Sequence, residues 1–222
     1  MYSINGVWVR EPSESVANIL EKGAEYHEGM IDLAVSLCSS KRTFLDVGAC
    51  FGLITKQMSP YAEKVLAFEP NQEILPCLRK NTENLHNVEI LEYGASNKEE
   101  SKRLVLFGNS GRSTYRDVPI AHLLKHKSTF RLQDTKTITI DSLNLKDVDL
   151  IKLDVEGHEK SVLQGAFKTI VHSKPVIIAE QKEGVDSTRF IPAALALLGY
   201  QVHSVFREKD YIYVHQQGSS GS

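Results

Sequence analysis

The stretch FLDVGACFG, residues 44–52, joins a short apolar run to a helix through a tight glycine turn. The apolar run leads to Asp46, and Gly48 and Gly52 then leave the backbone bare where the helical pattern begins at Leu53. Amide groups at such a helix start, next to glycine, let a charged or polar ligand approach the backbone closely. The stretch therefore predicts a strand–turn–helix unit with a ligand site at the carboxyl end of the strand.

Further short apolar runs follow along the chain, each ending at a carboxylate or a glycine. Strands buried on both faces of a parallel sheet have this continuous apolar character. Helical segments separate most of the runs, and strands that alternate with helices predict a parallel sheet. After Phe44-Leu45, the runs are Val65–Phe68, Val88–Leu91, Val148–Leu153 and Val176–Ala179, and the helical segments are Leu53–Met58, Ile74–Asn81, Glu159–Ile170 and Phe190–Leu198.

The last part of the chain follows a different pattern. Tyr200–Phe206 and Tyr211–His215 are separated only by four polar residues, which predicts a β-hairpin. We therefore predict an α/β fold, a Rossmann-like doubly wound sheet that is mostly parallel and has a C-terminal antiparallel β-hairpin. Rossmann-like methyltransferases have this layout, whereas the sheets of dehydrogenases usually stay parallel throughout.

We divide the chain into three parts. Residues 1–40 are expected to form an N-terminal helical segment, residues 41–217 the domain that contains the sheet, and residues 218–222 a flexible tail. Within the domain, residues 98–140 are polar and broken. We expect them to be an insertion over the strand ends, where substrate contacts often lie.

The composition excludes several classes of protein. The net charge is −2 and no basic face is evident, so we expect no nucleic-acid partner. The three cysteines have spacings unlike those of a disulfide framework or a zinc site. The start of the chain is too polar for a signal peptide, and no apolar run approaches the roughly 20 residues that span a bilayer. We therefore expect a cytoplasmic protein without a membrane span.

The acid ahead of the glycine turn distinguishes this loop from a dinucleotide-binding loop. Dinucleotide loops read G-x-G-x-x-G and hold a pyrophosphate, which Asp46 would repel. A carboxylate here can instead accept bonds around the positive aminopropyl end of a methionine-type cofactor. Glu69 ends the next strand, where an acid can bind both ribose hydroxyls. The candidate cofactor-binding residues are Asp46, Gly48, Ala49, Gly52, Glu69, Pro70, Asn71, and, for the adenine, Gly94 and Ala95 after Tyr93.

A second set of candidates lies in LIKLDVEGHE, residues 150–159. Lys152 interrupts an apolar strand, and a buried lysine needs a partner. Side chains alternate along a strand, so Lys152 and Asp154 share a face. Asp154 is at the carboxyl end of its strand, the following helix opens at His158, and the next strand ends at Glu180 beside Asp154 if the two strands are neighbours.

These four residues are the candidate catalytic residues. Asp154, His158 and Glu180 are candidate bases that would take a proton from an acceptor hydroxyl, and Lys152 would lower the pKa of a neighbour. The alternative is a structural pair of Lys152 with Asp154, with His158 capping a helix.

We predict no metal site. Asp154, Glu156 and Glu180 could hold Mg²⁺ to acidify a hydroxyl, but Lys152 would partly neutralise such a site. His122 and His126 are four residues apart, but they lack an intervening acid and have lysines as neighbours.

Five motifs resemble, in order, those of the FkbM family of methyltransferases. They are DVGACFG (46–52), AFEPN (67–71), ITIDSL (138–143), IKLDVEGHE (151–159) and PVIIAE (175–180). The resemblance runs from about Phe44 to His215 and implies S-adenosylmethionine at Asp46, Gly48, Gly52 and Glu69, with Asp154 near the methyl group. One departure is Cys50, where the loop of the family commonly has asparagine.

Members of this family are mostly O-methyltransferases of sugars, polysaccharides or polyketide-type metabolites. We therefore expect a methyltransferase that uses S-adenosylmethionine and acts on a hydroxyl of a sugar, glycan or small metabolite. One alternative is a methyltransferase of nucleic acid or protein. Enzymes that methylate base amino groups commonly have D/N-P-P-Y/F after the fourth strand, where this chain has DVEG. The other is a non-catalytic cofactor-binding protein, although burying charge without use is costly. The oligomeric state is not assigned.

Overall fold

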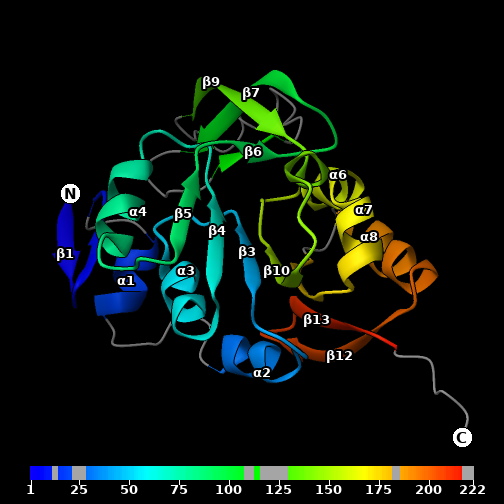
Figure 1. Cartoon of the computed structure of the whole chain (residues 1–222). Helices are drawn as coiled ribbons and strands as arrows, with labels where there is room; N and C mark the ends of the chain where they lie inside the picture. Colours follow the sequence, from blue (N-terminus) through cyan, green and yellow to red (C-terminus); the bar gives the residue numbers. More distant parts are fainter. Residues whose placement is uncertain (12–14, 22–28, 108–112, 116–129, 182–185, 217–222) are drawn as a thin grey trace, which may run out of the picture.

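The structure is a computed structural model and describes residues 1–11, 15–21, 29–107, 113–115, 130–181 and 186–216. Its centre is a seven-stranded sheet in the order β12-β13-β11-β10-β3-β4-β5 (Figure 1). Strands β3, β4, β5, β10 and β11 are parallel, whereas β13 runs antiparallel to both β11 and β12. The prediction of a mostly parallel sheet with a C-terminal antiparallel hairpin is confirmed. The bounds are β3 Thr43–Val47, β4 Lys64–Phe68, β5 Val88–Leu91, β10 Val148–Leu153, β11 Val176–Glu180, β12 Tyr200–Phe206 and β13 Asp210–His215.

Helices cover both faces of this sheet because its strands are apolar on both sides. Phe44 packs into the cluster formed with α2 (Met30–Ser36) and α3 (Leu53–Met58), whereas its neighbour Leu45 packs into the cluster on the opposite face. That opposite face is covered by α6 (Glu159–Gly165), α7 (Phe167–Ser173) and α8 (Asp186–Leu197), while α4 (Leu75–Thr82) packs beside α3. Burial of such side chains contributes about 1.5–3 kcal/mol each.

One predicted helix is divided in two. The run Glu159–Ile170 becomes α6 and α7, which meet at Ala166. A Cβ at Gly165 would lie 1.9 Å from Ser96 O, so α6 ends in direct backbone contact with the segment after β5. Asp141, from the ITIDSL motif, then accepts bonds from Lys168 N and Thr169 N and caps the new helix.

Residues 1–40 were expected to form a helical segment, and this expectation is wrong for the first residues of the chain. Strands β1 (Tyr2–Ile4) and β2 (Val7–Val9) form an antiparallel pair ahead of α1 (Ser15–Glu21) and α2. Asn5 and Gly6 both have positive φ, 49° and 79°, which is the backbone of a two-residue hairpin turn. The Asn-Gly pair was the signal for this turn, and helical periodicity further along the chain obscured it.

A second sheet lies over the carboxyl ends of the central strands (Figure 1). Its order is β6-β9-β7-β8, with bounds β6 Gly94–Ala95, β7 Glu100–Phe107, β8 Ser113–Thr114 and β9 Phe130–Ile138. It contacts the loop after β4 through Gln133, whose Nε2 donates to Pro70 O at 2.9 Å. Where the structure describes it, the polar stretch expected over the strand ends is therefore largely β structure. Residues 218–222, His122 and His126 lie outside the described residues.

Among the helices that the structure describes, none is long and apolar enough to cross a membrane.

Candidate active site

The glycine loop runs close to the end of β10. Gly48 has φ +88°, and a Cβ there would lie 2.0 Å from Asp154 O, so only glycine fits. Gly48 N and Ala49 N both donate to Phe68 O, at 3.1 and 3.0 Å, which ties the loop to β4 as well. The loop therefore joins the ends of three adjacent strands.

The departure at Cys50 has a conformational meaning. Cys50 has φ +52°, in the left-handed region that asparagine adopts more readily than most residues. The asparagine common at this position in the family would suit that backbone, and this chain adopts it with a cysteine.

Glu69 links the loop after β4 to the glycine loop. It is 4% exposed, and its two oxygens accept bonds from Cys50 N and Asn71 N, each at 2.8 Å. Burial raises the pKa of Glu69 to about 7, against the effect of these two amide bonds. Each carboxylate oxygen has a further lone pair, so Glu69 can still accept ligand hydroxyls.

Lys152 has the partners that its burial requires. Its Nζ lies 3.5 Å from Asp46 Oδ1 and 3.6 Å from Asp154 Oδ2, and it donates to Gly48 O at 3.3 Å. Asp46 is fully buried within β3, where Thr55 Oγ1 donates to its Oδ2 at 2.6 Å. The side chain of Asp46 therefore contacts Lys152 and Thr55 and has no exposed surface, and it is not among the residues that line the two cavities described below.

A small cavity opens at the glycine loop. It is lined by Gly48, Ala49, Cys50, Phe51, Leu53, Ile54, Lys152 and Asp154. The predicted cofactor loop and two of the predicted catalytic residues thus share one site.

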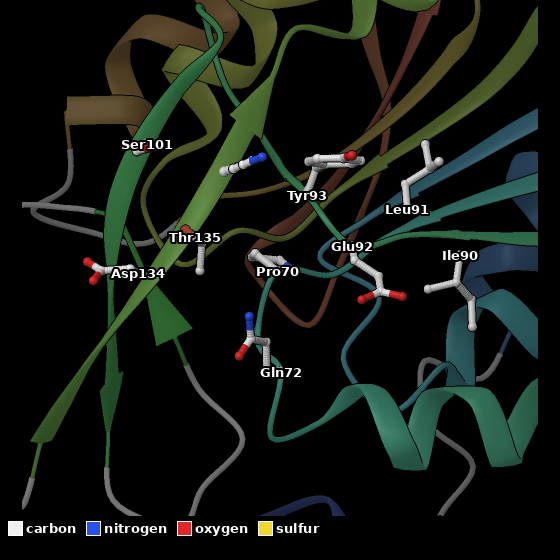
Figure 2. A pocket seen from close by; sticks show the side chains of 10 residues that line it. Pro70, Gln72, Ile90, Leu91, Glu92, Tyr93, Ser101, Asp134 and Thr135 are labelled. Carbon is white, nitrogen blue, oxygen red and sulfur yellow. The ribbon is translucent and has the colours of Figure 1, made fainter.

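A larger cavity of about 540 Å³ lies between the second sheet and the ends of β4 and β5. Figure 2 shows Pro70, Gln72 and Tyr93 on one side of it and Asp134 and Thr135 of β9 on the other. The remaining lining residues are Ile90, Leu91, Glu92, Ser101 and Lys136. Most of these side chains are polar, and Tyr93 adds an aromatic surface.

Gly94 and Ala95 do not line this cavity. Both lie in β6 and are buried, and a Cβ at Gly94 would lie 2.4 Å from the ring of Tyr115. Of the three residues Tyr93, Gly94 and Ala95, it is Tyr93 that lines this cavity.

Glu180 lies at the neighbouring strand end with residues that the sequence analysis missed. It pairs with Asp210 across β11 and β13, and it forms an ion pair with Lys209. Burial, together with repulsion from Asp154 and Glu180, raises the pKa of Asp210 to about 6. Finding Asp210 from the sequence would have required the register of the final hairpin.

His158 is in a different environment from the other candidates. Its Nε2 lies 3.0 Å from Ser96 Oγ, and its ring centroid lies 5.3 Å from that of Tyr115. Burial, with repulsion from Lys102, lowers the pKa of His158 to about 4, so the ring is neutral. Ser96 directly follows β6 and Tyr115 directly follows β8, so these contacts are with the second sheet and not with Lys152 or Asp154.

Within the described part of the chain, no group of three or more His, Cys, Asp or Glu side chains is arranged to hold a metal ion. Asp154, Glu156 and Glu180, which the sequence analysis considered as Mg²⁺ ligands, are not arranged as such a group.

Comparison with known proteins identifies the family. The sequence profile of the methyltransferase FkbM domain matches residues 46–202, which contain the glycine loop, Glu69, the Lys152–Asp154 pair and Glu180. This chain belongs to the FkbM methyltransferase family. The resemblance read from the motifs is confirmed, as is the expectation of an enzyme that transfers a methyl group.

Two curated relatives of this FkbM methyltransferase differ in how much they share with it. Hexuronic acid methyltransferase AglP of Haloferax volcanii is 28% identical over 224 residues, covering 96% of this chain and 87% of AglP. Methyltransferase 1 of Beauveria bassiana is 31% identical over 143 residues, covering 54% of this chain and 57% of that protein.

Solved structures agree on the fold. An FkbM methyltransferase from Methylobacillus flagellatus has a TM-score of 0.53 at 17% identity, covering 90% of this chain and 52% of its own. This FkbM chain thus spans about half the length of that protein. The precorrin 8w decarboxylase of Methanobacterium thermoautotrophicum has a TM-score of 0.51 at 16% identity, covering 97% of this chain and 100% of its own.

Proposed function

We propose that this protein transfers the methyl group of S-adenosylmethionine to a hydroxyl oxygen of a sugar in a glycan. The observation that carries the proposal is the convergence of the glycine loop, Glu69 and the Lys152–Asp154 pair on one edge of the sheet. The name of the relative AglP, a hexuronic acid methyltransferase, supports a sugar as the acceptor.

The residues present fit S-adenosylmethionine. Glu69 offers two buried carboxylate oxygens that can accept the ribose hydroxyls, and its pKa near 7 keeps it substantially ionised at neutral pH. The bare backbone of the glycine loop and the carboxylate of Asp154 border the small cavity, where the positive methionine end would lie. The larger cavity begins at Pro70, directly after Glu69, and Tyr93 offers a flat surface for the adenine.

When bound, S-adenosylmethionine supplies an electrophilic methyl group, so the protein must align the acceptor and remove its proton. We assign proton removal to Asp154, because its side chain is 21% exposed whereas those of Lys152 and Asp46 are 6% and 0% exposed. Lys152 Nζ holds the Asp154 carboxylate in place and favours its ionised form. Asp46 in turn pairs with Lys152 Nζ and fixes the position of the lysine side chain.

The charge of this edge favours a hydroxyl acceptor over a phosphate-rich one. Asp154, Glu180 and Asp210 gather there, while Lys152 and Lys209 are engaged in ion pairs with carboxylates. A nucleic-acid backbone needs cationic side chains to pair with its phosphates, and Lys152 and Lys209 are already paired with carboxylates. An uncharged hydroxyl needs no such cation and finds a proton acceptor in Asp154.

The test supplies the protein with S-adenosylmethionine carrying a labelled methyl group and with two oligosaccharides, one ending in glucuronic acid and one in a neutral hexose. We expect label in a saccharide and retention of that label after mild alkali, which removes methyl esters but leaves methyl ethers. Asp154→Asn should lower the rate by about 10² or more. Asp147→Asn, directly before the start of the same strand, is the matched control. Alkali-labile product would overturn the hydroxyl assignment, and full activity of Asp154→Asn would overturn its role.

A further inference from the structure

The turn after β10 contains two consecutive residues in the left-handed region. Glu156 has φ +53° and Gly157 has φ +96°. Glycine adopts this conformation freely, but a residue with a side chain is strained there and keeps it only where its surroundings impose it. Glu156 is two residues after Asp154, so whatever holds this turn also bears on the proposed proton acceptor.

Side chains from two different elements, α6 and β8, bond to the backbone of the turn. From within the helix that follows, Glu159 Oε1 accepts bonds from Gly157 N at 3.0 Å and Val155 N at 3.3 Å. From the second sheet, Thr114 Oγ1 in β8 donates to Glu156 O at 2.8 Å. Thr114 is 4% exposed, so this bond is shielded from water. The amide groups of the turn are thus held by α6, and the carbonyl group of its strained residue by the second sheet.

The turn also touches the glycine loop. Asp154 N donates to Val47 O at 3.0 Å, and Asp154 O lies where a Cβ at Gly48 would be only 2.0 Å away. The backbone of Asp154 is therefore packed directly against the bare backbone of Gly48. A rotation of the turn that relaxed Glu156 would shift both Asp154 and this contact.

We propose that Thr114 is a positioning residue, which keeps Glu156 left-handed and thereby places Asp154 and the Gly48 loop in their working geometry. The inference rests on the proposed function in assigning the Gly48 loop to the cofactor. Thr114 belongs to the second sheet, which we expect to face the methyl acceptor. This sheet therefore also sets the geometry on which binding of the methyl donor depends. The connection runs from Thr114 to Glu156 O, along the chain to Asp154, and from Asp154 O to Gly48.

The test compares two identical substitutions in the same sheet. Thr114→Val removes the hydroxyl that bonds to Glu156 O, whereas Thr137→Val removes one that donates to Lys98 O at 2.9 Å within the second sheet itself. The readouts are hydrogen exchange in the segment 153–159, followed by mass spectrometry, and calorimetric titration with S-adenosylhomocysteine. For Thr114→Val we expect faster exchange and about three- to tenfold weaker binding, the effect of one lost hydrogen bond. Thr137→Val should leave exchange in this segment and the affinity unchanged.

A second variant separates positioning from a general loss of stability. Glycine at position 156 adopts the left-handed conformation without strain, so the bond from Thr114 should become dispensable. Thr114→Val combined with Glu156→Gly is therefore expected to recover most of the lost affinity. A double variant as weak as Thr114→Val, or exchange in segment 153–159 unchanged by Thr114→Val, would overturn the proposal. If the wild-type protein does not bind S-adenosylhomocysteine, the proposed function fails, and exchange alone still decides the role of Thr114.

Discussion

Lys152 Nζ lies 3.5 Å from Asp46 Oδ1, and the two residues are direct partners in the register of β10 and β3. This ion pair joins the strand that leads into the glycine loop to the strand that carries the proposed proton acceptor. Both side chains are almost completely buried, at 6% and 0% exposed. Buried pairs of this kind are poor sources of stability, but losing one partner leaves an uncompensated charge. The pair is therefore better explained by the geometry that it imposes on the site.

Replacing Lys152 tests this explanation. Lys152→Met should destabilise the protein by about 3–5 kcal/mol, because Asp46 would keep a buried charge without its cation. The double variant Lys152→Met with Asp46→Asn removes both charges and should recover most of that loss. Urea unfolding of the three proteins measures both effects. Equal stability of the single and double variants would show that the two side chains are not coupled.

The protonation of Glu69 makes ligand affinity depend on pH. Burial raises the pKa of Glu69 to about 7, and ribose hydroxyls bond best to the ionised carboxylate. The affinity for S-adenosylhomocysteine should therefore rise as the pH increases through about 7 and level off above it. In Glu69→Gln the affinity should be weaker and this pH dependence absent. Glu89→Gln, an exposed residue of β5, should behave as the wild type in calorimetric titrations across this range.

His158 should make the protein sensitive to acid. Its pKa is lowered from 6.5 to about 4 in the folded chain, so the unfolded chain binds a proton first as the pH falls. The stability that the neutral His158 ring contributes is therefore complete above about pH 6.5. It is lost as the pH falls from about 6.5 to 4, by up to roughly 3 kcal/mol. His158→Gln should flatten this part of the profile of unfolding free energy against pH. The exposed His172→Gln should not, and an unchanged profile for His158→Gln would contradict the burial argument.

Gly6 and Gly48 have similar backbone angles, so comparing them separates the cost of the left-handed conformation from the cost of a steric clash. Gly48 and Gly6 have φ of +88° and +79°, but an added Cβ meets Asp154 O at 2.0 Å only at Gly48, with nothing within 4 Å at Gly6. Gly6→Ala should cost about 1–2 kcal/mol from the left-handed conformation alone. Gly48→Ala should cost clearly more and should also abolish binding of S-adenosylhomocysteine. Thermal unfolding and calorimetry of both variants provide the comparison, and equal losses would show that the loop can yield.

Much of the fold could be predicted from the sequence because burial on both faces makes parallel strands apolar throughout. Leu53–Met58 was predicted with the bounds that α3 has, and the final hairpin was found from its polar turn. The N-terminal hairpin and the end of helix α6 were harder to predict. The turn at Asn5-Gly6 was overlooked beside a helical pattern, and the division between α6 and α7 depends on the distant Ser96.

The site was predictable where neighbouring strands and alternating side chains determine contacts. Lys152 meets Asp154 as the alternation required, and Glu180 lies on the adjacent strand. Side-chain direction in three dimensions was not available from the pattern. Asp46 is buried and bonded to Thr55, and Gly94 and Ala95 are buried in β6. His158 contacts Ser96 and Tyr115. Asp210 enters the site through the pairing of β13 with β11, and Thr114 through a side-chain bond to Glu156 O.

The most direct measurement is calorimetric titration of the protein with S-adenosylhomocysteine, with NAD⁺ as the control and Glu69→Gln as the matched variant. The account predicts saturable binding of S-adenosylhomocysteine alone, weakened in Glu69→Gln because the ribose hydroxyls lose an acceptor. Binding of NAD⁺ in its place, or no binding of either compound by the wild-type protein, would contradict the account.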